Sequence, residues 1–179
     1  MNKAASADLT QYPWYAAGAW DDLQQGDILP DCPVLVPTED LTPHLIGIDE
    51  DVATGVPIGV ETYNLIIMSQ SCDLIQASID QVLLCAFFPA DDLTKDQRTA
   101  VMKERRPSQH MVEACEIEGA VFSRQVVNFR TLYTLPKTFV TAFANSVENR
   151  VRLLPPYREH LSQAFARYFM RVGLPRPLQ

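Results

Sequence analysis

Two short apolar runs constrain the fold of this chain more than any other feature. Residues 65–68 and 82–88 are continuously hydrophobic, and polar or turn-forming residues bound each run. A short apolar run of this kind is typical of a strand buried in a sheet. We therefore predict a central strand at residues 60–68 and a second buried strand at residues 81–88.

Other segments predict further short strands. Pro30 and Pro33 interrupt an apolar stretch at residues 28–36, and prolines confine such a strand to a sheet edge or split it at a bulge. Additional strands are expected at residues 116–122 and 125–134. Residues 137–145 fit either a strand or a short helix.

Two segments predict helices. Thr94 and Gln97 have the spacing of a capping box, which starts a helix over about residues 93–103. Two prolines precede apolar residues at three-to-four spacing, so an amphipathic helix is expected over residues 156–172. The chain is thus predicted to be mainly β with added helices (α+β), as an SH3-like small barrel with a mid-chain helix and a C-terminal amphipathic helix.

The same patterns predict which side chains form the core. Each of them lies in an apolar run, on the apolar side of an alternating strand or on the apolar face of the last helix. The expected core residues are Leu65, Ile67, Leu83, Cys85, Phe87, Val127, Phe129, Phe165 and Phe169.

A length of 179 residues fits one domain with an appendage. Residues 1–22 form an aromatic N-terminal arm, because Trp14, Tyr15 and Trp20 are too many aromatic residues for a disordered segment. Residues 23–179 form a single globular, barrel-like domain. This domain contains an acidic loop at residues 37–59 and the terminal helix at residues 156–172.

Charge is distributed unevenly along the chain. Residues 1–100 contain 3 Lys and Arg against 16 Asp and Glu, whereas residues 101–179 contain 12 against 6. Such asymmetry indicates either a partner-facing surface or two halves that neutralise one another in the folded domain. The acidic first half disfavours, without excluding, nucleic acid as a partner.

Neither a metal site nor a cofactor site follows from the spacing of residues. Cys32, Cys72, Cys85 and Cys115 form no C-x-x-C pair, and no two histidines have zinc-site spacing. No apolar run approaches the roughly 20 residues that span a bilayer, and the first residues lack a signal-peptide core. We expect a cytoplasmic protein with free thiols and no membrane contact.

A cluster of small polar residues follows the first apolar run, and strand ends are common places for functional groups. Ser69, Cys72 and Asp73 are the candidate catalytic residues, and Gln70 is a candidate binding residue. A nucleophilic cysteine needs a histidine, a basic group or a helix N-terminus nearby, and the sequence does not identify one. The alternative is that the polar residues satisfy loop backbone groups while Cys72 packs inward. We expect the four residues to line one pocket or rim.

Three segments, in this order, resemble the PemK/MazF-type toxins. Residues 25–29 (QGDIL) resemble the opening strand of that family, residues 64–70 (NLIIMSQ) its second strand, and residues 123–132 (SRQVVNFRTL) a late strand. The resemblance implies a small SH3-like barrel and cleavage of RNA, and Ser69 is the one catalytic position that carries over. The family has an arginine close to its second strand, whereas residues 59–63 here contain none.

These observations leave two classes of function. The first is a non-catalytic protein-binding or accessory module, with a bacterial defence or toxin–antitoxin role implied by the resemblance. Its partner is another protein subunit, bound through Trp14, Tyr15 and Trp20 and through Arg158, Arg167 and Arg171, since aromatic residues and arginine are enriched at interfaces. The second class is a toxin-like enzyme acting on RNA, or a Cys72-dependent hydrolase.

Overall fold

A computed structural model describes residues 12–37 and 58–170 of the chain. The strands are β1 (Tyr15–Gly18), β2 (Ile28–Pro37), β3 (Ile58–Ile67), β4 (Gln81–Pro89), β5 (Gln109–Val112), β6 (Gln125–Pro136) and β7 (Arg150–Leu153). The helices are α2 (Ser71–Leu74), the 3-10 turn η3 (Ala90–Asp92), α3 (Lys95–Met102), α4 (Lys137–Ser146) and α5 (Tyr157–Phe169). No helix within these ranges is long and apolar enough to cross a bilayer.

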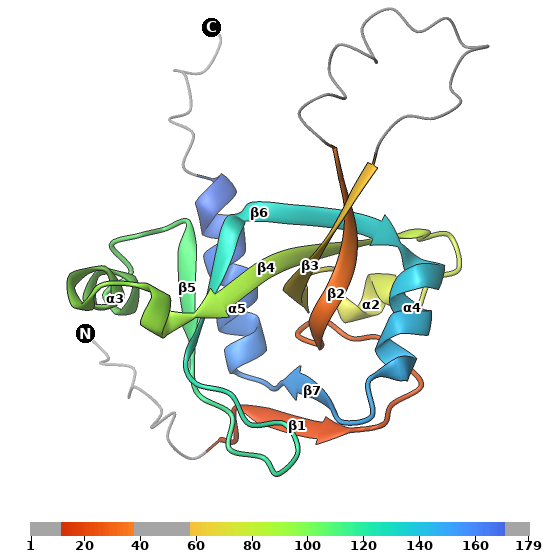
Figure 1. The fold of residues 1–179 in the computed structure, drawn as a ribbon, viewed down its shortest axis with the longest axis horizontal. Helices are drawn as coiled ribbons and strands as arrows, with labels where there is room; N and C mark the ends of the chain where they lie inside the picture. Colours follow the sequence, from red (N-terminus) through yellow and green to blue (C-terminus); the bar gives the residue numbers. More distant parts are fainter. Residues whose placement is uncertain (1–11, 38–57, 171–179) are drawn as a thin grey trace, which may run out of the picture.

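The strands form two open antiparallel sheets (Figure 1). One sheet has five strands in the order β2-β3-β4-β6-β5, and the other pairs β1 with β7. The sheets meet at a single bridge between Asp27 and Arg152, next to a hydrogen bond from the Leu153 N–H to the Gly26 carbonyl (2.9 Å). The predicted α+β class, mainly strands with added helices, is therefore confirmed.

The two apolar runs lie in the middle of the five-stranded sheet, which is covered on both faces. Alternate residues of β3 and β4 enter different core clusters. Ile66 and Phe87 face the cluster that contains Leu161 of α5, whereas Leu65 and Leu84 face the cluster that contains Val140 of α4. Because both faces are buried here, residues 65–67 and 82–88 do not alternate apolar with polar residues.

The predicted core is confirmed in its main part. Leu65, Ile67, Cys85, Phe87, Val127 and Phe129 are buried, and Leu83 and Phe165 are partly buried. The prediction was wrong for Phe169, which is 50% exposed. Its ring packs edge-on against Phe165 and Tyr168 within α5, whose end extends beyond the sheet (Figure 1).

Most predicted elements are present with small changes in their ends. Helix α3 begins with the predicted capping box, in which the Gln97 N–H donates to Thr94 Oγ1 and the Thr94 N–H donates to Gln97 Oε1. Residues 137–145 are helical, as part of α4. The strand predicted at residues 116–122 was wrong, because this segment has only an isolated bridge between Cys115 and Phe122.

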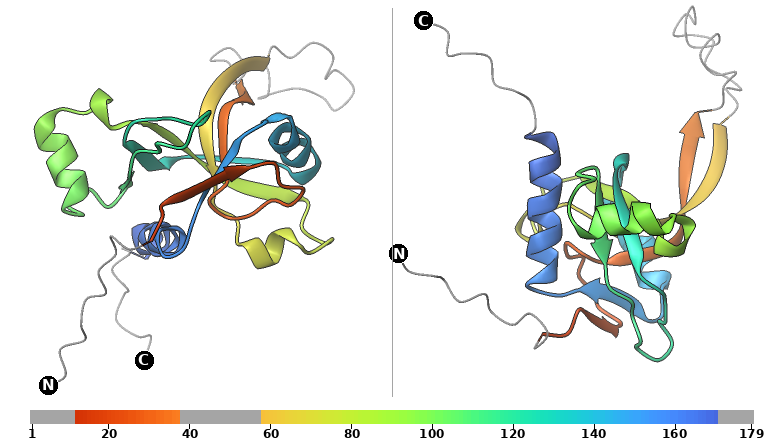
Figure 2. Two further views of the ribbon diagram at one scale, coloured as in Figure 1. Left: turned by 90° about the horizontal axis from the view of Figure 1, so that it is seen from below. Right: turned by 90° about the vertical axis from the view of Figure 1, so that its left-hand side faces the viewer.

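The described part of the N-terminal arm is built into the domain. Tyr15–Gly18 forms β1, which pairs with β7 near the other end of the chain (Figure 2). The Trp14 ring stacks on Tyr157 at 3.6 Å, and Tyr15 is buried with its hydroxyl donating to the Glu113 carbonyl. Residues 1–11 lie outside the described residues, as do residues 38–57 of the acidic loop and 171–179, which include Arg171.

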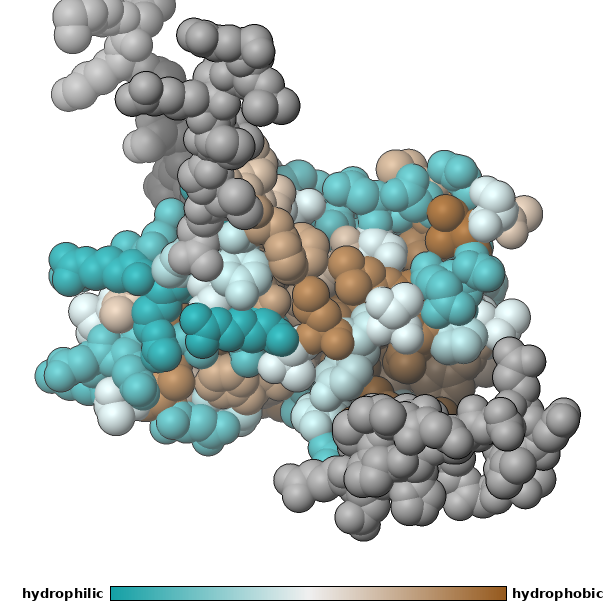
Figure 3. All heavy atoms as spheres, turned by 90° about the horizontal axis from the view of Figure 1, so that it is seen from above, coloured by the Kyte–Doolittle hydropathy of each residue, from teal (hydrophilic) through white to brown (hydrophobic). Residues whose placement is uncertain are grey.

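The outer half of the β2–β3 ribbon projects from the body of the domain (Figure 2). Leu35 is 65% exposed and lies opposite Val60, which is 64% exposed. Strand β3 pairs with β4 only over Leu65, Ile66 and Ile67, so the rest of β3 has β2 as its only neighbouring strand among the described residues. Viewed from the side of β6, hydrophobic residues gather over the middle of the face and toward α4, whereas the part over α3 is hydrophilic (Figure 3).

Candidate functional site

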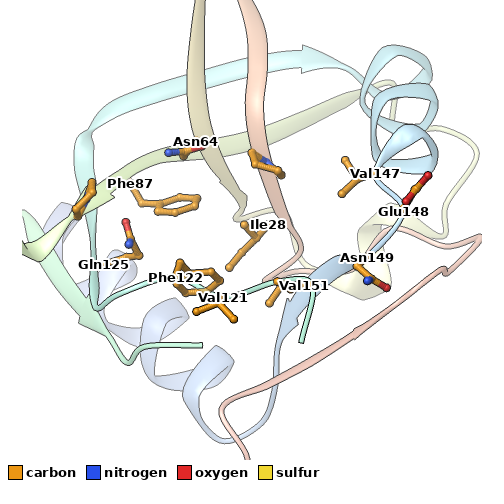
Figure 4. Close-up of a pocket in the computed structure, with 14 residues that line it drawn as sticks. Ile28, Asn64, Phe87, Val121, Phe122, Gln125, Val147, Glu148, Asn149 and Val151 are labelled. Atoms are coloured by element: carbon orange, nitrogen blue, oxygen red, sulfur yellow. The ribbon is translucent and has the colours of Figure 1, made fainter. Parts of the chain in front are cut away.

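An apolar cavity of about 540 Å³ opens between the five-stranded sheet and β7 (Figure 4). Ile28, Phe87 and Val151 supply its walls from three different strands, and Phe122 closes one side. The complete lining is Ile28, Pro30, Asn64, Phe87, Pro89, Gly119, Ala120, Val121, Phe122, Gln125, Val147, Glu148, Asn149 and Val151. A concave, mainly apolar site with a few polar groups is the usual form of a binding site.

A tight turn at residues 117–120 holds one wall of this cavity in place. The bridge between Cys115 and Phe122 closes the segment, and the Ala120 N–H donates to the Ile117 carbonyl at 2.9 Å. Gly119 has a φ of 79°, and a side chain there would meet the Asn149 amide at 2.8 Å. The positive φ favours glycine at this position, whereas the Asn149 side chain is exposed and could move away from an added side chain.

Hydrogen bonds fix two of the polar groups that line this cavity. Asn64 accepts the Asp31 N–H through Oδ1 at 3.1 Å, and Gln125 donates through Nε2 to the Ser123 carbonyl at 2.8 Å. Glu148 is the one ionisable residue among the lining residues. The cavity thus offers apolar walls and fixed amides but no nucleophile with an adjacent base.

The polar cluster predicted from the sequence is only partly brought together. Gln70, Cys72 and Arg158 line a second cavity of about 290 Å³, together with Gln25, Ser71, Glu159, Ser162 and Gln163. Ser69 and Asp73 do not line it. The Ser69 hydroxyl instead accepts the Leu83 N–H at 2.8 Å, which ties the end of β3 to β4.

Cys72 is an exposed free thiol in the single helical turn α2. Its sulfur lies 3.9 Å from the Asp73 carboxylate, and no histidine lines the cavity beside it. Arg158, the cation of this cavity, donates through Nε and Nη2 to Glu159. The other cysteines are buried, and desolvation raises the pKa of the Cys32 thiol to about 11 and that of Cys85 to about 12.

A buried charge cluster lies where the two sheets meet. Asp27 is completely buried and pairs with both Arg150 and Arg152 of β7. Arg152 Nη2 donates to Asp27 Oδ2 at 3.1 Å, and Arg150 Nη2 donates to the carbonyls of Trp20 and Asp22. Acidic and basic halves of the chain therefore neutralise one another at this point.

Arg150 is almost as deeply buried as Asp27, with 1% of its side chain exposed. Its Nε and Nη1 atoms make no hydrogen bond with the described residues, although Nε is 3.4 Å from Asp27 Oδ2. Desolvation lowers the pKa of its guanidinium, and the charge of Asp27 acts in the opposite direction. Arg150 is thus buried with only part of its hydrogen-bonding capacity met by the described residues, and Asp27 supplies its counter-ion.

The aromatic residues proposed for partner binding contact the domain itself. Tyr15 is buried, Trp14 is stacked on Tyr157, and the Trp20 ring lies 4.4 Å from the Arg152 guanidinium. Burial raises the pKa of the Tyr15 phenol. Arg158 and Arg167 are the predicted basic contact residues whose positions are described, and Arg167 is 60% exposed.

No local pattern indicates the apolar cavity, because five separate segments contribute to its lining. Phe122 was assigned to a strand and Ile28 to an edge, and neither pattern places the two side chains together. Within residues 12–37 and 58–170, no three His, Cys, Asp or Glu side chains are placed to hold a metal ion. The chain matches no model of a known protein family and no curated protein.

Proposed function

We propose that this protein is a non-catalytic protein-binding module that receives an apolar side chain of a partner protein in the cavity between the sheets. The observation that supports this function is the apolar, hydrogen-bond-fixed lining of that cavity around Ile28, Phe87 and Phe122. Interface energy is concentrated where large anchors fill pockets of this kind. Val121, which is 73% exposed at the cavity, offers further apolar contact.

The charges around the cavity suggest the chemistry of the partner segment. Glu148 is exposed and lies on the connection between α4 and β7, beside the apolar walls. An aromatic or aliphatic residue next to an arginine or lysine would fill the cavity and pair with Glu148. Charges at the rim of an interface act mainly on the association rate, so this pair should influence speed and specificity more than affinity.

The wider identity of the module also belongs to this proposal. An SH3-like barrel related to the PemK/MazF-type toxins is supported by the antiparallel neighbours β2, β3 and β4 and by the bridge that joins β7 to Asp27. We place the protein in the bacterial cytoplasm, as an accessory subunit of a defence or toxin–antitoxin system. Four free cysteines support a reducing compartment.

A site-specific crosslinking experiment tests the binding function. A photoreactive amino acid at Val121 should crosslink the partner in cells, whereas the same group at Ile75, which is 82% exposed elsewhere, should not. The partner is then purified and its affinity measured. Val121→Arg should weaken binding at least about tenfold and Ile75→Arg should leave it unchanged. Equal affinity of the two variants would reject the cavity as the binding site.

The enzymatic alternative is supported by one feature, the presence of Cys72 and Arg158 in the same small cavity. Incubation of the purified protein with random single-stranded RNA tests the toxin-like activity, and generic ester substrates test the hydrolase. We expect no turnover. Activity that is abolished by Cys72→Ser but retained by Cys85→Ser would favour the enzyme over the binding module.

A further inference from the structure

A third cavity, of about 440 Å³, lies between the end of α3, the start of β5 and the last turns of α5. It shares no lining residue with the cavity proposed for partner binding. Four lining residues are apolar or small and four are polar or charged. They are Val101, Pro107, Ala164 and Met170, and Glu104, Gln109, His110 and Arg167.

Two opposite charges stand at the opening of this cavity. Arg167 Nη1 lies 3.8 Å from Glu104 Oε2, and the two side chains are 60% and 71% exposed. An exposed pair at this separation contributes little to stability. Both groups can therefore exchange this contact for a ligand that presents the opposite charges.

The inner polar groups are poorly satisfied by the protein. Gln109 Oε1 is buried and accepts no hydrogen bond from any described residue. Buried acceptors normally have a partner, so an unpaired one indicates a missing donor. Desolvation lowers the pKa of His110 to about 4, with Arg167 and His160 acting in the same direction and Glu104 against it. The imidazole is thus uncharged at neutral pH and forms a neutral wall.

Glu104 occupies a backbone conformation that favours glycine. Its φ is 53°, immediately after the C-cap of α3, where glycine is the usual residue. A glutamate at this position costs conformational energy but places a carboxylate at the opening of the cavity. The energetic cost supports a role for that carboxylate beyond ending the helix.

We propose that this cavity binds a free α-amino acid with an apolar side chain. The ligand carboxylate pairs with Arg167, and its ammonium donates to the Glu104 carboxylate. Gln109 Oε1 is closed off from solvent, so it accepts from the ammonium only when the Gln109 side chain turns toward the cavity. The side chain packs against Val101, Ala164 and Met170. A pair of protein charges only 3.8 Å apart suits a ligand whose two charges are attached to the same carbon atom.

Calorimetric titration of the full chain with leucine, methionine and phenylalanine tests this site. At least one should bind saturably with a Kd between about 1 μM and 1 mM. Isocaproate, which lacks the ammonium, and isoamylamine, which lacks the carboxylate, should each bind about tenfold more weakly than leucine, because each loses one charge-assisted contact.

Variants assign the binding to this cavity. Arg167→Met and Gln109→Leu should each weaken binding about tenfold, whereas Arg130→Met, an exposed control on β6, should not. Arg167 is exposed, so its variant should fold normally even if the Gln109 variant does not. Absence of saturable binding by all three amino acids, equal binding of leucine and isocaproate, or unchanged affinity in Arg167→Met would each overturn the proposal.

Discussion

The two halves of the β2–β3 ribbon contrast sharply although they belong to the same pair of strands. At the inner end, the aliphatic side chains of Leu29 and Leu65 are completely buried, and so is Asp27, which directly precedes β2. At the outer end, Leu35 and Val60 are largely exposed. A charge is thus inside the protein while aliphatic side chains are outside it.

The contrast shows that packing against neighbouring elements, rather than the hydrophobicity of the strands themselves, decides which side chains are buried. The inner end lies between the two sheets and receives Arg150 and Arg152 from β7, so its carboxylate has partners. The outer end extends past β4, which pairs with β3 over only three residues. Exposed aliphatic residues that stay together on one strand pair form a patch that a partner can cover.

Removing the buried carboxylate should have the largest effect. Asp27→Asn should lower the free energy of unfolding by about 3–5 kcal/mol, because two buried arginines then lose their counter-ion. Urea denaturation followed by circular dichroism measures it. Asp22→Asn is the matched control, since Asp22 is 55% exposed and should cost less than about 1 kcal/mol. Equal effects would mean that the inner cluster is not held by its charges.

A pair of aliphatic truncations on β3 tests the comparison directly. Leu65→Ala should cost about 2–5 kcal/mol because it opens a cavity in a closed core. Val60→Ala, five residues away at the exposed end, should change stability by no more than about 0.5 kcal/mol. A large cost at Val60 would show that the outer half is covered in solution, for example by another copy of the chain.

His110 extends the comparison to an ionisable group without a buried counter-ion. Its native pKa of about 4 lies below the 6.5 of a histidine in an unfolded chain, so as the pH falls the unfolded chain takes up a proton before the native protein does. Stability should therefore fall as the pH decreases from 6.5 to 4, by on the order of 2 kcal/mol. Thermal melts across this range should show a shallower dependence for His110→Asn. Identical pH dependence in the wild type and in His110→Asn would contradict the assignment of this effect to His110.

The smallest expected effect is a gain in stability. Glu104→Gly should stabilise the protein by about 0.5–1 kcal/mol, because glycine adopts the left-handed conformation without strain. Differential scanning calorimetry measures the change, and Glu118→Gly, an exposed position beside Gly119, is the control without a positive φ. A loss of stability would show that the contact with Arg167 outweighs the backbone strain.

Local signals explain which parts of the fold were predictable. The apolar runs predicted β3 and β4, and the capping box of Thr94 and Gln97 predicted the start of α3. Strand β7 was missed because its sequence places arginines at two of four positions, and a buried arginine is unusual without a partner. The partner, Asp27, lies 125 residues from Arg152, beyond the reach of any local pattern.

The candidate sites were likewise predictable only where their residues lie close together in the sequence. Gln70 and Cys72 are two residues apart in sequence, so their shared cavity was predictable from the polar cluster. Ser69 does not line this cavity, because its hydroxyl accepts the Leu83 N–H of β4 just beyond the end of β3. The cavity around Phe122 combines five separate segments and the cavity around Gln109 combines two, residues 101–110 and 164–170, which only the folded topology brings together.

The bond between Asp27 and Arg152 has a consequence for the order of events during synthesis. Asp27 leaves the ribosome 125 residues before Arg152, an interval of about 6–25 s at 5–20 residues per second. During this interval β1 has no strand to pair with, and the carboxylate remains in water. The domain can therefore complete its core only after β7 has left the ribosome, and a chain released before β7 should be a substrate for chaperones rather than a folded protein.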